Sequence, residues 1–138
     1  MKKIIVIAMS VILLFSAMVM PISAAQADNE IAKPYWTHTN SINATIGFID
    51  GVGYAEAALN GKFGSTAVYI DVIVYRQSGG DWVYITEEHT NATGAAVAIS
   101  CPFEITSGTY YKAEYTFTVH RNGTGEVVAR DVYKTYEG

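Results

Sequence analysis

Cysteine and positive charge are both scarce in this chain. Cys101 is the only cysteine among 138 residues, which excludes an intramolecular disulfide framework, a thiolate zinc cluster and a C-x-x-C redox pair. Nine basic residues stand against 13 acidic ones, so the chain lacks the excess of positive charge expected of a nucleic-acid-binding protein. The fold must therefore be stabilised by a hydrophobic core.

Enzyme motifs are also missing. The sequence has no Gly-x-Ser-x-Gly elbow, no His-Glu-x-x-His motif, no Walker loop and no Gly-x-Gly-x-x-Gly following a strand. Half of the residues are hydrophobic and only 16% are charged, which is typical of a folded domain. We therefore predict one folded domain that is not an enzyme and needs no cofactor.

The first 27 residues are predicted to form a cleavable signal peptide. Lys2 and Lys3 supply a positive start, residues 4–20 are almost entirely apolar, and the small-x-small tripeptide 25–27 suits a signal peptidase. The mature chain would then begin at Asp28. The alternative is an uncleaved membrane anchor, because residues 4–20 come close to the length that spans a bilayer.

The rest of the chain is predicted to be exported as an acidic domain. Without residues 1–27 it keeps 111 residues, and the loss of Lys2 and Lys3 leaves 7 basic against 13 acidic residues, a net charge of −6. No second stretch is long enough to span a bilayer, so we expect a secreted protein, free or associated with the cell surface, without stable membrane insertion. Residues 28–40 show no periodicity and are predicted to form an N-terminal arm.

The remaining residues, 41–138, alternate between apolar and polar positions in short runs that turn signals separate. This two-residue period is typical of half-buried β-strands. The expected strands are 41–48, 54–60, 68–75, 82–88, 96–101, 110–120 and 126–136. Seven strands over about 100 residues predict an all-β fold, a seven-stranded antiparallel sandwich of the immunoglobulin or fibronectin-III-like kind. The missing cysteine pair excludes an antibody-type domain.

The third and sixth strands show the alternation most clearly. In the third, four β-branched residues share one face; in the sixth, Tyr111, Tyr115 and Phe117 share one face. We predict that these three aromatic residues lie in the core, together with Trp82 of the fourth strand. Sandwiches of this kind often carry a tyrosine at the start of the sixth strand whose hydroxyl caps the neighbouring corner, and Tyr110 or Tyr111 is placed for that role.

Several short segments also carry a family resemblance. They are the Lys-Lys pair (2–3), Tyr-Trp-Thr-His-Thr-Asn-Ser-Ile (35–42), Asn-Gly-Lys (60–62), Gly-Asp-Trp-Val (80–83) and Ser-Gly-Thr-Tyr-Tyr-Lys-Ala (107–113). Together they resemble a family of small secreted proteins of Gram-positive, clostridial-type bacteria. The resemblance implies a stand-alone immunoglobulin-like β-sandwich, and it implies no catalytic or ligand-binding residues.

Histidine and cysteine offer little chemistry. Glu87 and His89 would share a strand face, but two ligands are too few for a metal site, and a solvated strand end is the simpler interpretation. His38 and His120, the other two histidines, have no ligand pattern around them. Cys101 shares the parity of apolar neighbours and is predicted to be an inert core residue. We therefore predict no metal site.

Outward-facing aromatic residues give the main functional indication. If the third and sixth strands are neighbours, Tyr69, Asp71 and Tyr75 share an outer face with Tyr110 and Lys112. Such an amphipathic surface suits contact with a protein or a carbohydrate, because rings supply area while their hydroxyls stay wet. The alternative is that these rings only stabilise the sheet through cross-strand pairs.

Trp36, in the expected arm, is the second candidate binding position. The leading hypothesis is a secreted, non-enzymatic module that binds a cell-envelope polymer or a protein partner. The alternative is a self-associating extracellular structural or matrix component, whose arm or edge strand adds to a neighbour's sheet. A small metal-dependent hydrolase that uses His89 or His120 is the weakest of the three, and the oligomeric state stays open.

Overall fold

The computed structural model describes residues 36–138. The expected signal peptide, and residues 28–35 of the expected arm, lie outside this range. Within residues 36–138, no helix is long and apolar enough to cross a membrane.

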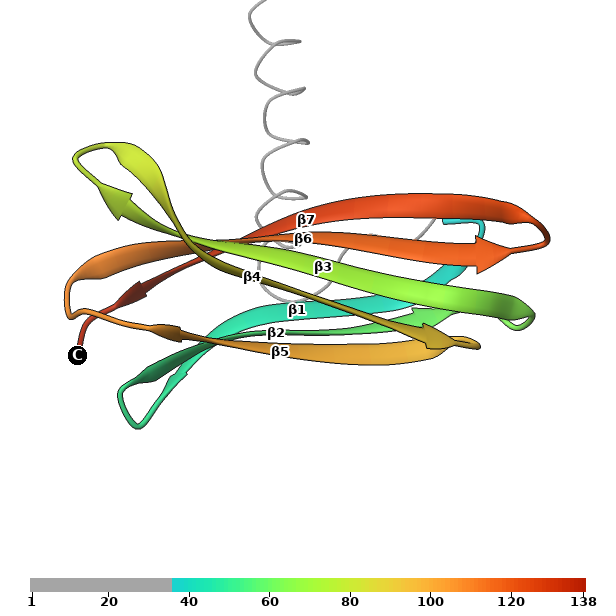
Figure 1. The fold of residues 1–138 in the computed structure, drawn as a ribbon, viewed down its shortest axis with the longest axis horizontal. Coiled ribbons are helices and arrows are strands. Elements are labelled where there is room, and N and C mark those ends of the chain that lie inside the picture. The colour runs from blue at the N-terminus through green and yellow to red at the C-terminus, as the bar shows by residue number, and fades with distance from the viewer. Residues whose placement is uncertain (1–35) are drawn as a thin grey trace, which may run out of the picture. The chain divides into compact units, whose positions relative to one another are not determined.

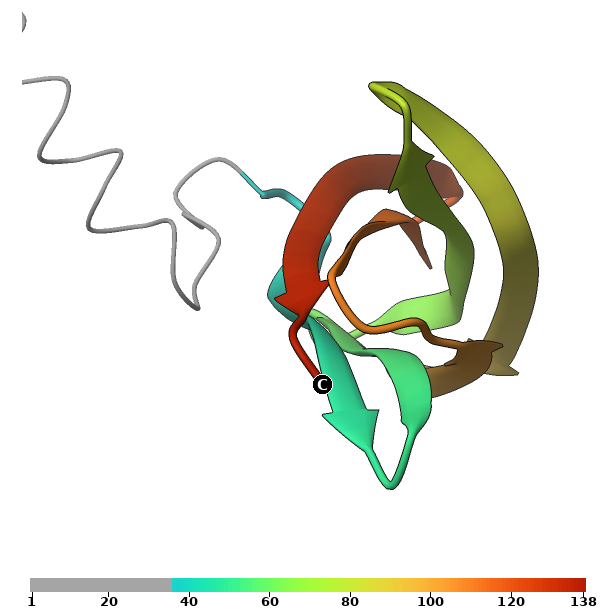
Figure 2. The ribbon, with the colours of Figure 1, turned by 90° about the vertical axis from the view of Figure 1, so that its left-hand side faces the viewer.

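The described chain forms seven antiparallel strands in two sheets (Figure 1). The strands are β1 (Thr39–Ile49), β2 (Val52–Gly61), β3 (Ser65–Ser78), β4 (Asp81–Thr93), β5 (Ala96–Glu104), β6 (Thr109–Arg121) and β7 (Thr124–Tyr136). One sheet has the order β1-β2-β5 and the other the order β4-β3-β6-β7. Seen from one end, the two sheets curve around a shared core (Figure 2). The predicted all-β sandwich is confirmed, and pairing of β4 with β3 gives it the fibronectin-III-like strand order.

The core is built mainly by β3 and β6, the two central strands of the four-stranded sheet. In the middle of β3, every second residue points inward and is fully buried: Val68, Ile70, Val72 and Val74. The inward residues of β6 are equally buried: Tyr111, Ala113, Tyr115, Phe117 and Val119. The three-stranded sheet contributes aliphatic residues, alanines, Phe103 and Cys101, and Cys101 of β5 is 2% exposed, as its parity predicts. Burial raises the pKa of the Cys101 thiol, so it stays protonated and inert.

Two buried tyrosines connect parts of the sandwich through their hydroxyls. The Tyr115 hydroxyl of β6 crosses the core and lies 2.7 Å from the carbonyl oxygen of Thr45 in β1 and 3.2 Å from that of Glu56 in β2. Tyr111 caps the corner before β6, because its hydroxyl accepts the backbone N–H of Thr106 at 2.8 Å. Of the two tyrosines considered for the corner, Tyr111 therefore has the role.

Several strand ends differ from those expected. β4 continues to Thr93, five residues past the expected end, because it stays hydrogen-bonded to β3 along its whole length. β5 runs through Pro102, which an edge strand tolerates since the missing N–H needs no partner there. β1 begins at Thr39, so the last two residues of the expected arm belong to it. The first turn is limited to Asp50 and Gly51, both with positive φ.

The entry of the chain into β1 is held by one carboxylate on β7. Glu126 accepts the backbone N–H groups of Thr37 at 2.7 Å, His38 at 3.0 Å and Thr39 at 2.8 Å, and also the Thr37 hydroxyl at 2.8 Å. Partial burial raises the pKa of Glu126, but hydrogen bonds from Thr37, Thr39 and His38 outweigh it and lower the pKa to about 2. This carboxylate ties the first strand of one sheet to the last strand of the other.

We predict that Glu126→Gln destabilises the domain at neutral pH and much less in acid. The folded protein holds Glu126 ionised more strongly than the unfolded chain, so its contribution is complete above about pH 4.5 and is lost as the pH falls toward 2. The expected loss at pH 7 is about 1–2 kcal/mol after allowance for solvent screening. Urea unfolding at pH 7 and pH 3 measures the free energy of unfolding, with Glu104→Gln as the control. An equal difference in this free energy between wild type and Glu126→Gln at both pH values would show that the ionised Glu126 carboxylate does not stabilise the fold.

We predict that Tyr111→Phe lowers the free energy of unfolding by about 1–2 kcal/mol, because it leaves the Thr106 N–H without its acceptor. The matched control is Tyr110→Phe, since the neighbouring side chain lies on the outer face and is exposed. Chemical denaturation of both variants is the measurement. Equal stabilities would show that the corner bond contributes nothing.

Candidate functional site

The outer face of the four-stranded sheet brings side chains from four strands into rows. The register places Tyr75 of β3 opposite Tyr84 of β4 on one side and Lys112 of β6 on the other, and Lys112 opposite Tyr133 of β7. The adjacent row is Glu87, Ile73, Glu114 and Asp131, one residue from each strand in the same order. A row of rings therefore borders a row that is mostly carboxylates.

Five rings gather on this face, and two of them flank one ammonium group. We call this set the aromatic cluster; it consists of Tyr75, Trp82, Tyr84, Tyr110 and Tyr133, with Lys112 at its centre. Ring centroids lie 5.6 Å apart for Trp82 and Tyr110, 5.8 Å for Trp82 and Tyr133, and 5.9 Å for Tyr110 and Tyr133. Tyr75 and Tyr84 meet edge to face at 6.4 Å. These separations are typical of stabilising aromatic pairs.

Lys112 is almost enclosed although it lies on an outer face. Its Nζ is 4.7 Å from the centre of the Tyr75 ring, 4.8 Å from that of Trp82 and 3.0 Å from Glu114 Oε2. Only 11% of the side chain is exposed. Burial lowers the pKa of Lys112, but the hydrogen bond to Glu114 and nearby negative charge outweigh it, so the pKa is above its usual value. The amine is thus charged at neutral pH.

A β-bulge in β4 brings a second ring and carboxylate together. Tyr84 pairs with Tyr75 but Thr86 pairs with Val74, so Ile85 is an extra residue on the β4 side. The bulge moves Glu87 to the face that Tyr84 occupies, where the Tyr84 hydroxyl donates to Glu87 Oε1 at 3.1 Å. Desolvation and this hydrogen bond raise the pKa of the Tyr84 hydroxyl, which therefore stays protonated as a donor.

The predicted site residues separate into three groups. Tyr75, Tyr110 and Lys112 come together in the aromatic cluster. Tyr69 and Asp71 lie on the same outer face but outside the cluster; Tyr69 is about 20 Å along β3 from Tyr75 and packs against His120 at 5.5 Å. Trp36 lies away from that face, beside the β2–β3 turn, where its carbonyl oxygen accepts Lys62 Nζ at 2.6 Å.

The prediction that Trp82 lies in the core is wrong. It sits on the outer face because it pairs with Gln77 at the end of the β3–β4 hairpin, which extends past the facing sheet (Figure 1). Sequence analysis also missed Tyr84 and Tyr133, which are 53% and 47% exposed. The signal that could have found Tyr133 is its parity in β7, shared with Val127 and Asp131.

The outer face of the three-stranded sheet is different. Its β2 and β5 residues are mostly small or polar, and around Ala58 and Ala98 they leave a shallow hollow of about 290 Å³. Tyr54 is the aromatic residue on this face within residues 36–138. Of the two sheets, the four-stranded one therefore carries most of the exposed aromatic residues, while Phe63, 97% exposed, lies in the β2–β3 turn outside both sheets.

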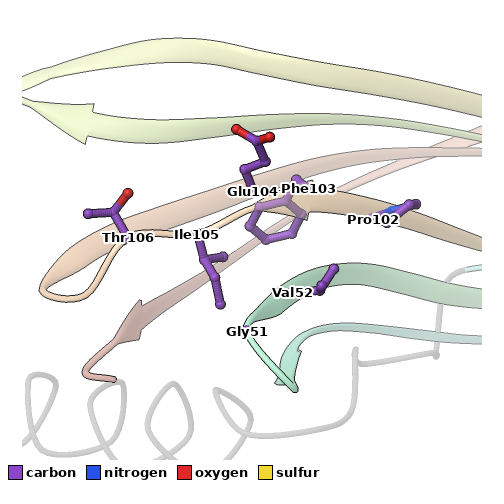
Figure 3. Close-up of a pocket in the computed structure, with 7 residues that line it drawn as sticks. All are labelled: Gly51, Val52, Pro102, Phe103, Glu104, Ile105 and Thr106. Carbon is purple, nitrogen blue, oxygen red and sulfur yellow. The ribbon is translucent and has the colours of Figure 1, made fainter.

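A second, larger hollow lies at the end of the sandwich where β5 meets the β1–β2 turn. It holds about 450 Å³, opens to solvent and is lined by Gly51, Val52, Pro102, Phe103, Glu104, Ile105 and Thr106. Figure 3 shows Ile105 directed toward the β1–β2 turn and Glu104 directed the opposite way. Polar and apolar atoms line it in similar amounts, but the Glu104 carboxylate is directed away from the β1–β2 turn, so the hollow has few charged groups that could orient a ligand.

The histidines gather no metal-binding group. His89 pairs with Asp71 across the β3–β4 ladder and shares a face with Glu87, as the parity predicts. Among residues 36–138, no three His, Cys, Asp or Glu side chains are arranged to hold a metal ion. His38 has a local partner, since its Nε2 lies 2.7 Å from the Thr124 hydroxyl.

Comparisons with known proteins give only remote structural similarities. No protein-family model matches the chain, and no curated protein matches it. Among solved structures, the Escherichia coli curli protein CsgC is 9% identical with a TM-score of 0.41, covering 67% of this chain and 96% of its own. The Arabidopsis thaliana protein At1g01470 is 9% identical with a TM-score of 0.39, covering 81% and 89%. Similarity at this level carries no functional argument.

We predict that Lys112→Met lowers the free energy of unfolding by about 1 kcal/mol. Methionine keeps most of the packing, but the variant loses the ion pair to Glu114 and the attraction to the rings of Tyr75 and Trp82. Lys134→Met is the control, because its ammonium contacts a single ring, Phe48, at 5.6 Å. Thermal and urea unfolding are the measurements, and a Lys112→Met variant as stable as the wild type contradicts the prediction.

Proposed function

We propose that this protein is a secreted, non-enzymatic binding module of a Gram-positive, clostridial-type bacterium. It attaches to a cell-envelope polymer or a protein partner through the aromatic cluster. The observation that carries this proposal is the concentration of five rings, three of them exposed, on the sheet face that encloses the Lys112 ammonium.

The exposure of the rings supports binding over a purely structural role. Tyr84 and Tyr133 each leave about half of their surface in water, although both have ring neighbours. Tyrosine and tryptophan lose little conformational entropy on binding and bury large area, which is why they dominate the energetics of interfaces. The cluster is thus a rigid aromatic surface that a partner can cover.

Polar groups beside the rings can orient a bound partner. Glu87, Glu114 and Asp131 border the ring row, and the hydroxyls of Tyr84 and Tyr133 lie at its edge. A binding surface of this composition combines an apolar centre with a polar rim. The Tyr84 hydroxyl donates to the Glu87 carboxylate, but its pKa is raised, so this pair does not activate a nucleophile and a binding role suits the face better than a catalytic one.

We predict that the double variant Tyr84→Ser/Tyr133→Ser binds washed Gram-positive cell walls at least 10-fold more weakly than the wild type. Truncating an interface aromatic costs more than about 1 kcal/mol, and about 1.4 kcal/mol corresponds to a factor of ten. The measurement is co-sedimentation of purified residues 28–138 with the walls over a range of protein concentrations.

The control is Tyr54→Ser on the other sheet, which should bind as the wild type does. Equal binding by the wild type and the double variant contradicts the proposed site. If the wild type instead forms assemblies whose mass grows with concentration, and these persist in the double variant, the self-associating alternative is favoured.

A further inference from the structure

The aromatic cluster already holds a cation, and this shows what chemistry the face accepts. The Lys112 ammonium lies between the rings of Tyr75 and Trp82 and is paired with Glu114. A ring face and a carboxylate together replace most of the water around it. The same combination stabilises cationic ligands in general, because ring quadrupoles and negative charge both attract them.

The combination of ring and carboxylate occurs twice more on the same face, once on each side of Lys112. On β4 the bulge at Ile85 places Tyr84 beside Glu87. On β7, Tyr133 lies opposite Lys112, and Asp131 lies opposite Glu114. Both rings are about half exposed. Within residues 36–138 neither Glu87 nor Asp131 forms an ion pair, in contrast to Glu114.

The charge of the face favours a positive partner. Its carboxylates are Asp71, Glu87, Glu114 and Asp131, and Lys112 is its one ammonium among the described residues. Lys112 is neutralised by Glu114, which leaves a net negative surface around the rings. The whole chain has the same sign, since 13 acidic residues exceed 9 basic ones. An anionic polymer would be repelled from this face.

The orientation of the rings argues against a flat sugar surface as the ligand. The rings of Tyr110 and Tyr133 are 35° apart. The other interplanar angles are larger: 50° for Trp82 and Tyr110, 51° for Trp82 and Tyr133, and 85° for Tyr75 and Tyr84. Rings tilted this far do not form a common plane on which successive sugars could stack. The Tyr84 ring instead lies beside Glu87. Tyr133 and Asp131 are likewise neighbours on the outer face of β7.

We propose that the outer face binds an extended basic peptide, with one Lys or Arg side chain at Tyr84 and Glu87 and a second at Tyr133 and Asp131. The backbones of β4 and β7 are separated by three strand spacings, or about 14 Å, which an extended peptide covers in about four residues. The Trp82 side chain spans part of this gap, since its ring lies over Lys112 and 5.8 Å from the Tyr133 ring, so the peptide would cross above it. Arginine suits both positions, because its guanidinium can stack on a ring and pair with a carboxylate at the same time. This inference rests on the proposed binding function and names its ligand class.

The test uses a capped pentapeptide, Arg-Gly-Ser-Gly-Arg, and the same peptide with both arginines replaced by glutamine. Calorimetric titration into residues 28–138 should show at least 10-fold tighter binding of the arginine peptide, and the difference should shrink at high salt. Glu87→Gln and Asp131→Asn should each weaken binding of the arginine peptide at least threefold. Glu104→Gln, an exposed carboxylate on β5, should leave it unchanged.

Equal binding of the two peptides, or an equal effect of Glu104→Gln, overturns the inference. So does tighter binding of a neutral or amino-sugar oligosaccharide that depends on the same rings. The proposed function is tested separately. It is overturned if Tyr84→Ser/Tyr133→Ser binds walls as the wild type does. If that variant loses wall binding but the wild type does not prefer the arginine peptide, only the basic peptide is excluded as the ligand. Thermal unfolding of every variant shows that the fold is retained.

Discussion

The two-residue alternation of β3 and β6 is the constraint on which the rest of the structure depends. Their inward residues fill the centre of the core, and Val72 and Phe117 are entirely without solvent contact. A register slip of one residue would turn every one of these side chains outward, so the core fixes the register strongly. The arrangement of the outer face depends on the same register, because Tyr75 and Lys112 lie opposite each other only while the core is in register.

This constraint also explains which parts of the fold the sequence predicts. β3 and β6 are central strands with one face in the core, so their alternation is clean and their side-chain directions are predicted correctly. β4 is an edge strand without a single fully buried residue, and its bulge at Ile85 breaks the period. No alternation rule places Tyr84 and Glu87 on one face, because they are three residues apart.

The candidate site divides in the same way. Tyr75, Tyr110 and Lys112 come from the central strands, and parity alone places them on the outer face. The rest of the cluster comes from the edge strands β4 and β7, where the absence of buried positions removes the contrast that parity needs. Trp82 shows the consequence: its size suggests the core, but at the tip of the hairpin beyond the facing sheet there is no core to enter.

Sheet stability alone does not require the rings to be concentrated on one face. Cross-strand aromatic pairs contribute about 0.2–1 kcal/mol each, and every strand pair in the molecule could have used them. The three-stranded sheet stays in register over nine pairs between β2 and β5 while its outer face carries mostly small and polar residues. This sheet is stabilised by the backbone hydrogen bonds between its strands and by its buried inward face. β3 and β6 have both kinds of interaction as well. Stability therefore does not require five rings on one face, and this is the reason for proposing that a partner covers them.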